Sequence, residues 1–143
     1  PDTHLEFDLD LAIRQDSENP VYYVQYAHAR ICTLISAMAE DGHSIPEGRI
    51  DAALLNTEQE RELIKQLAQF TDEIRLAARD YDPSRINRYV IELAARFHRF
   101  YNSCRIKDAE PELLGARLVL CECTRRVIEN SLDIVGVTAP EKM

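Results

Sequence analysis

Glycine and long apolar runs are scarce in the sequence or missing from it, and each of these two shortages excludes a class of function. The chain has four glycines and no tryptophan among 143 residues. It has neither a glycine-rich loop of the kind that binds nucleotide phosphates nor the G-x-S-x-G elbow of a nucleophilic serine. No apolar run approaches the roughly 18 residues of a membrane span, and no signal-peptide pattern opens the chain. We therefore expect neither an active site nor a contact with a membrane.

The cysteines and histidines form no pattern that binds a metal ion or closes a disulfide framework. Because 45% of the residues are apolar, one domain can build its core without cross-links, and we expect reduced thiols in a cytoplasmic protein. Cys121 and Cys123 lie two positions apart on a predicted helix, roughly 200° around its axis, so they cannot chelate one metal ion. The histidines lie on separate predicted elements. We expect neither a metal nor a cofactor in this chain.

Helix-starting and helix-ending residues dominate the rest of the sequence and predict an all-α, compact bundle of about four long helices with short connecting helices. Asparagine or aspartate followed by proline predicts starts at Pro20 and Pro83, and Glu110-Pro111 predicts a third. Thr57 and Glu60 match a capping box. Apolar residues at three- and four-residue spacing give each helix a buried face. The predicted long helices span residues 20–41, 57–81, 83–101 and 111–135.

Two further segments have weaker signals. Residues 42–56 contain glycine and proline and then an apolar stretch, which predicts a loop with a short helix. Residues 1–18 alternate apolar and acidic side chains in part and could also cap a short helix, so we expect an extended segment followed by a helical one. No linker divides the remainder, and residues 19–143 form one predicted domain.

Positive charge is concentrated in one part of a chain whose formal net charge is -8. Residues 84–107 carry six cationic side chains and a single acidic one. Such asymmetry can leave a basic face on an acidic protein, and arginine suits bidentate contact with phosphate. The alternative is that these arginines form local ion pairs on a solvated helix surface, and composition alone favours that alternative. The candidate phosphate contacts are Arg85, Arg88, Arg96 and Arg99.

An aromatic stripe on the first long helix is the strongest candidate for a binding surface. Tyr23, Tyr26 and Arg30 are spaced by three and four residues, so they share one helix face. Two rings beside a guanidinium can stack an unpaired base and hold a phosphate. The alternative places the tyrosines at the edge of the bundle with Arg30 paired to an acid, and periodicity alone favours that arrangement.

Four segments carry specific sequence patterns. They are NPVYYVQYAHARI at residues 19–31, FHRFYN at 97–102, ARLVL at 116–120 and VGVTAPEKM at 135–143. Together they resemble the C-terminal anticodon-binding domain, of the DALR type, of arginyl-tRNA synthetases. The resemblance extends over essentially the whole chain from residue 3. One departure is SLDIVG at residues 131–136, where the family usually has a Gly-Leu and a Leu-Gly pair. The two signature motifs with which class I synthetases bind and activate ATP are missing.

The resemblance implies that the parent protein is an ATP-dependent arginine-tRNA ligase, with ATP bound by a catalytic domain outside this chain. Residues 1–18 would then follow the catalytic domain, and residues 19–143 would recognise the anticodon stem-loop. The implied partners are an arginine-accepting tRNA and the enzyme's own catalytic domain, in a monomeric protein. The resemblance also assigns Tyr23, Tyr26, Arg30 and Met143 to a pocket for a displaced loop base. The alternative function is a helical protein-interaction or scaffold domain that does not bind RNA.

Overall fold

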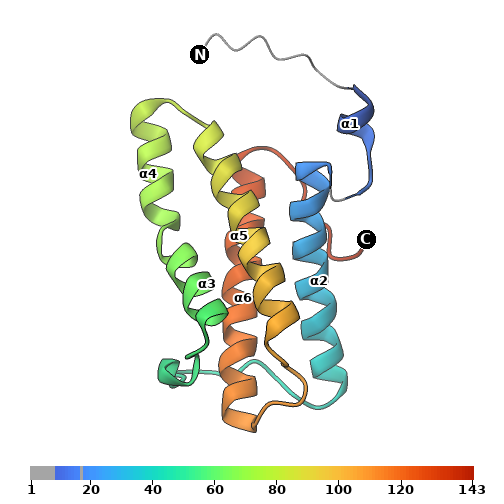
Figure 1. Cartoon of the computed structure of the whole chain (residues 1–143), viewed down its shortest axis with the longest axis vertical. Coiled ribbons are helices and arrows are strands. Elements are labelled where there is room, and N and C mark those ends of the chain that lie inside the picture. Colours follow the sequence, from blue (N-terminus) through green and yellow to red (C-terminus); the bar gives the residue numbers. More distant parts are fainter. Residues whose placement is uncertain (1–8, 17) are drawn as a thin grey trace.

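Helices make up most of the chain in the computed structural model, which describes residues 9–16 and 18–143. Within these residues there is no β-strand, and the predicted all-α fold is confirmed (Figure 1). The elements in chain order are α1 (Leu9–Ile13), α2 (Pro20–Glu40), the 3-10 helix η1 (Ala52–Leu54), α3 (Glu58–Ala68), α4 (Phe70–Asp80), α5 (Ser84–Ser103) and α6 (Pro111–Ile134). The short helix predicted within residues 42–56 is η1.

The capping residues fix the start of α2 and α3 as predicted. The side-chain oxygen of Asn19 accepts hydrogen bonds from the backbone N–H groups of Val21 and Tyr22, and Pro20 occupies the first turn of α2. At α3, the Thr57 hydroxyl accepts from the backbone of Glu60, while the Glu60 carboxylate accepts from the backbone N–H of Thr57. This capping box satisfies two N–H groups that would otherwise have no partner.

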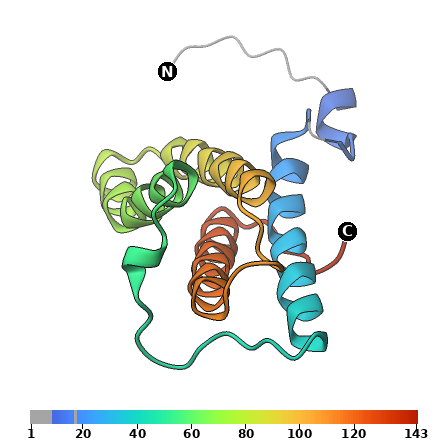
Figure 2. The same cartoon turned by 60° about the horizontal axis from the view of Figure 1, so that its bottom comes forward.

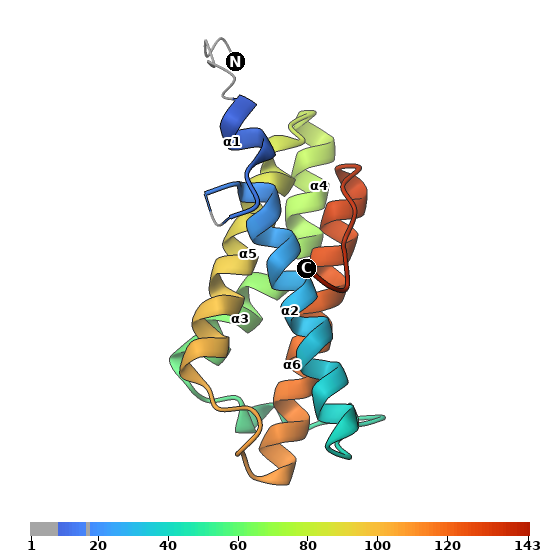
Figure 3. The same cartoon turned by 90° about the vertical axis from the view of Figure 1, so that its right-hand side faces the viewer.

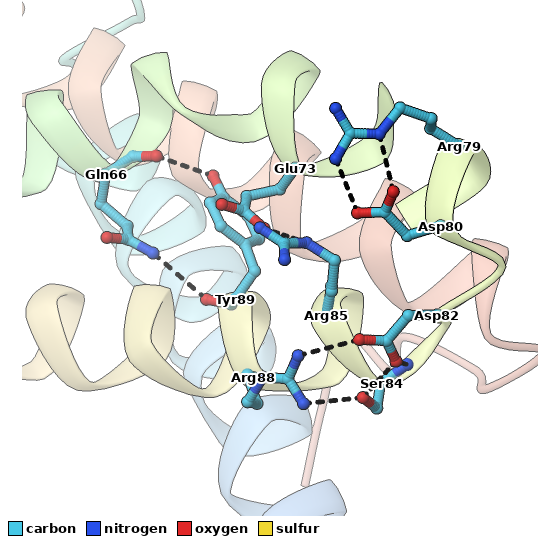
Figure 4. Close-up of polar contacts among 9 residues, drawn as sticks. All are labelled: Gln66, Glu73, Arg79, Asp80, Asp82, Ser84, Arg85, Arg88 and Tyr89. Carbon is cyan, nitrogen blue, oxygen red and sulfur yellow. Dashed lines mark hydrogen bonds and ion pairs between the residues drawn. The ribbon is translucent and has the colours of Figure 1, made fainter. Parts of the chain in front are cut away.

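The single helix predicted over residues 57–81 is wrong, because two helices, α3 and α4, meet at Gln69. There the backbone N–H of Gln69 bonds back only three residues, to the carbonyl of Gln66 at 3.2 Å. The Tyr89 hydroxyl of α5 donates to the same carbonyl at 2.9 Å, and the Gln66 amide donates in turn to the Tyr89 carbonyl. This exchange is visible in Figure 4. Tyr89 of α5 thus supplies a hydrogen-bond donor where α3 and α4 meet, and both of these helices pack along α5.

The core lies where α2, α3, α5 and α6 face one another (Figure 2). Most of the apolar residues at the predicted three- and four-residue spacing are buried there, although Ile64 of α3 is exposed. On α5 the buried ring is Phe100, while its neighbour Tyr101 is only partly buried. The largest fully buried apolar side chains are Ile31, Leu63, Leu93, Phe97, Phe100, Leu118 and Ile128.

Of the segment predicted over residues 1–18, the structure describes residues 9–16 and residue 18. The residues from 9 to 13 form the helix α1, as the helical half of the prediction requires. The extended half falls on residues 1–8, which lie outside the described residues. In the parts of the chain that the structure describes, no helix is both long and apolar enough to cross a membrane.

Candidate nucleic-acid interface

A groove of ≈ 650 Å³ separates the exposed side of α2 from the connection between α5 and α6. Tyr26 and Arg30 of α2 line one side, and Tyr101 at the end of α5 lies with them. Residues 104–108 of the connection form the opposite wall, and Met143 completes the lining. Figure 3 shows α2 facing the viewer with the C-terminus beside it. The groove therefore combines helix, loop and chain end in one surface.

Three rings form a continuous aromatic platform beside this groove. The imidazole of His98 lies 5.0 Å from the ring of Tyr23 and 5.9 Å from that of Tyr26, measured between ring centroids. The Tyr26 and His98 planes are stacked at 28°, and Tyr26 is 42% exposed. Burial raises the pKa of Tyr23, so its hydroxyl stays protonated at neutral pH. The predicted shared face is thus confirmed for both tyrosines, and α5 contributes a third ring.

Arg30 lies between two aromatic rings. Its guanidinium carbon is 4.1 Å from the ring centroid of Tyr101 and 5.8 Å from that of Tyr26. Both distances are within the range of cation–π contact. Arg30 forms no ion pair with any residue that the structure describes. The alternative in which Arg30 pairs with an acid is therefore wrong, and the cation is available to a ligand.

His98 and Tyr101 were not among the candidate residues from the sequence. Both lie on the third predicted helix, three residues apart and beside its apolar stripe, as the two tyrosines do on α2. Burial and the charge of Arg30 lower the pKa of His98 to about 4. The imidazole is consequently neutral at physiological pH and serves as a ring surface, not as a cation.

The C-terminal segment reaches the groove by folding back along α2. Gly136 ends α6 with a φ of 74°, a left-handed conformation that suits glycine. The Gln25 side chain then donates to the carbonyl of Thr138 at 2.8 Å, and His28 Nδ1 donates to the carbonyl of Pro140 at 2.9 Å. These two bonds hold the chain end against α2. They place the half-exposed Met143 beside Tyr26 and Arg30, as the resemblance implied.

The four arginines of α5 that were candidates for phosphate contact do not line the groove, and each has an acidic partner. Arg85 pairs with Glu73 at 3.0 Å, and Arg88 pairs with Asp82 at 3.2 Å (Figure 4). Arg96 and Arg99 share Glu92, and Arg96 also contacts Glu62. The structure thus contains the local ion pairs of the alternative interpretation. A phosphate contact by these four side chains remains an untested prediction.

The described residues contain no group of three or more histidine, cysteine or acidic side chains placed to hold a metal ion. Cys121 is buried and Cys123 is exposed, so the two thiols point to different environments, as their spacing predicted. Burial raises the pKa of the Cys121 thiol to about 12. This thiol is therefore protonated and unreactive at neutral pH.

Comparison with known proteins agrees with this geometry. The model of the DALR anticodon binding domain matches residues 24–143. The chain belongs to the DALR anticodon binding domain family. The arginine–tRNA ligase of Ruminiclostridium cellulolyticum is 51% identical over 142 residues, which are 99% of this chain and 25% of that protein. That of Caldanaerobacter subterraneus subsp. tengcongensis is 53% identical over 144 residues, with 100% and 26% covered.

A solved structure places the same fold in a longer protein. Thermus thermophilus arginyl-tRNA synthetase matches 96% of this DALR domain and 23% of its own chain, with a TM-score of 0.78 and 30% identity. The DALR domain thus spans about a quarter of the length of the relatives it matches. The alternative of a scaffold domain that does not bind RNA is not favoured.

Proposed function

We propose that this chain recognises the anticodon stem-loop of an arginine-accepting tRNA. The observation that carries the proposal is the position of Arg30, a cation without an ion pair in the described part of the chain, between the rings of Tyr26 and Tyr101. An unpaired loop base exposes both a planar face and a nearby phosphate. A guanidinium beside aromatic rings is complementary to both.

Each part of the groove has a distinct role in the proposal. Tyr26, the more exposed of the two tyrosines, offers its ring for stacking. His98 stacks against Tyr26 and is itself in contact with the ring of Tyr23. Met143 adds an apolar contact to the same base, since its side chain lies at the groove and is half exposed. Arg30 contacts the backbone phosphate or the edge of the base.

The parent protein, in this proposal, is a monomeric, cytoplasmic arginine–tRNA ligase. Its catalytic domain lies outside this chain, binds ATP and attaches arginine to the tRNA. This domain needs no cofactor of its own, because recognition of a stem-loop uses only side chains and backbone. Residues 1–18 would follow the catalytic domain, and residues 19–143 would form the recognition domain. The catalytic domain is thus the second partner, beside the tRNA.

Substitution of Arg30 tests the role of the groove. Arg30→Gln should weaken binding of an arginine anticodon stem-loop by about tenfold, because it removes a charge-assisted contact. Arg61→Gln is the matched control, since Arg61 is exposed and also lacks an ion pair within the described residues, but lies on α3 and does not line the groove. Fluorescence anisotropy with labelled RNA measures both, and thermal unfolding checks that both variants fold. Equal affinities for the two variants would contradict the assignment.

A further inference from the structure

Few of the basic side chains are free to meet a phosphate. The chain has 17 lysines and arginines, and most form ion pairs with acidic side chains. Those without an ion pair in residues 9–16 and 18–143 are Arg30, Arg49, Arg61, Arg105 and Lys142. Only Arg30 and Arg105 of these line the groove. They lie on opposite walls, one on α2 and the other on the α5–α6 connection.

The other charges of the connection do not replace Arg105. Lys107 is paired with Asp41 at 2.7 Å, which ties the connection to the end of α2. Asp108 also lines the groove and contributes a negative charge. Arg105 is exposed and is consequently the cation of this wall that a phosphate can reach without breaking an ion pair of the protein.

The backbone of Arg105 is held by a buried arginine of the core. Arg117 of α6 donates from Nη1 to the carbonyl of Arg105 at 2.6 Å. The same guanidinium donates from Nε to Glu60 Oε1 at 2.7 Å. Arg117 is 8% exposed and Glu60 is fully buried. One planar side chain thus links the start of α3 to the groove wall, which a lysine with its point charge could not do in the same geometry.

Further contacts at the start of α3 stabilise this link. Glu60 Oε2 accepts from the backbone N–H and the hydroxyl of Thr57, both at 2.8 Å. The Thr57 hydroxyl lies 3.5 Å from the sulfur of Cys104, the residue before Arg105. Burial raises the pKa of Glu60, but the hydrogen bonds of Thr57 and the hydrogen bond and charge of Arg117 outweigh it and hold that pKa below its ordinary value. Glu60 is therefore ionised and keeps Arg117 oriented toward the loop.

We infer that Arg105 supplies a second phosphate contact, across the groove from Arg30, and that the buried Arg117–Glu60 pair is the positioning device that holds it there. The inference rests on the proposed binding of a stem-loop in this groove. It differs from that proposal in assigning a residue outside the aromatic face of α2. It also gives a role to the ARLVL segment of α6, which lies in the core and does not line the groove. In Figure 2 the α5–α6 connection passes beside α2.

Arg105→Gln is the first test, because it removes an exposed charge and leaves the backbone bond to Arg117 intact. Affinity for an arginine anticodon stem-loop should fall by about five- to tenfold. The slope of log affinity against log salt should decrease by about one, as expected for the loss of one phosphate contact. Discrimination against a mismatched loop should stay unchanged, since phosphates carry no sequence information. Arg61→Gln is again the control.

Arg117→Lys tests the positioning role when it is combined with Arg105→Gln. If Arg117 acts through Arg105, Arg117→Lys weakens binding in the wild-type background and has no further effect in the Arg105→Gln background. A purely structural role would give the same loss in both backgrounds. If Arg117→Lys does not fold, Glu60→Gln replaces it in the same double-mutant cycle with Arg105→Gln, because glutamine has nearly the same shape as glutamate.

The outcomes of these experiments distinguish the role of Arg105 from the proposed binding of the stem-loop. If the wild-type chain binds the stem-loop and Arg30→Gln weakens binding, but Arg105→Gln behaves like Arg61→Gln, the inference is wrong and the proposed function stands. If the wild-type chain does not bind the stem-loop, both are wrong. If Arg105→Gln and the cycle behave as stated, both are supported.

Discussion

A neutral imidazole between two tyrosines is the residue-scale feature on which the aromatic platform depends. His98 contacts Tyr23 and Tyr26, and its Nε2 atom is buried without a hydrogen-bond partner among the described residues. A buried nitrogen without a partner has an energetic cost, and a positive charge at this position would be repelled by Arg30. The neutral ring therefore contributes to the platform through its shape and stacking, and protonation of the ring would lower stability.

His98 should make folding sensitive to acid. Its pKa is about 4 in the folded chain and about 6.5 in an unfolded one. Between these values the unfolded state binds more protons, so the free energy of unfolding falls as pH decreases from about 6.5 to 4. His98→Phe keeps a ring in place and removes this contribution. Urea unfolding at several pH values should show wild type losing stability relative to the variant across that range, and parallel curves would contradict the prediction.

The sequence predicted the shared face of Tyr23, Tyr26 and Arg30 because helical spacing alone determines it. It could not decide between an ion pair and a cation–π contact for Arg30. That choice depends on Tyr101, which lies about 70 residues away in the chain and joins the groove only when α5 packs on α2. For the same reason His98 and Arg105 gave no signal, since their importance comes from neighbours on other elements.

At the scale of the elements, local chemistry fixes where helices begin, and distant contacts decide where they are interrupted. Asn19, Thr57, Pro20 and Pro111 gave the starts correctly because a cap acts within four residues. The start predicted at Pro83 falls one residue before α5 begins. The interruption at Gln69 has no such local signal. At this position the Tyr89 hydroxyl of another helix donates a hydrogen bond to the carbonyl of Gln66.

Tyr89→Phe tests this account of the α3–α4 junction. The Tyr89 hydroxyl is buried, and burial raises the pKa of Tyr89 far above its ordinary value, so it is a donor at any physiological pH. Its removal leaves the Gln66 carbonyl without that bond and should lower the free energy of unfolding by about 1 to 2 kcal/mol. Tyr81→Phe is the matched control, because Tyr81 is 92% exposed and should tolerate the same change. Equal unfolding midpoints for the two variants would contradict the account.

At the scale of the whole molecule, the distribution of charge decides more than the net charge does which cations can contact a phosphate. The chain is acidic overall, and in the part that the structure describes most of its lysines and arginines are paired with acidic side chains. Most such exposed pairs contribute little stability. Because of these ion pairs, few cations in the described residues are unpaired. Two of the unpaired cations, Arg30 and Arg105, line the same groove. The sequence could indicate the basic segment but not which of its basic side chains are paired, because that depends on which acidic residues each helix packs against.

The central claim is that this groove recognises an arginine anticodon stem-loop, and a titration of the chain with that RNA tests it most directly. Binding should be measurable, should weaken as salt increases, and should be at least about fivefold tighter than for a stem-loop whose loop sequence comes from a different tRNA. The RNA stem is the same in both, so the difference reports on the loop alone. No binding, or equal affinity for the two loops, would contradict the account.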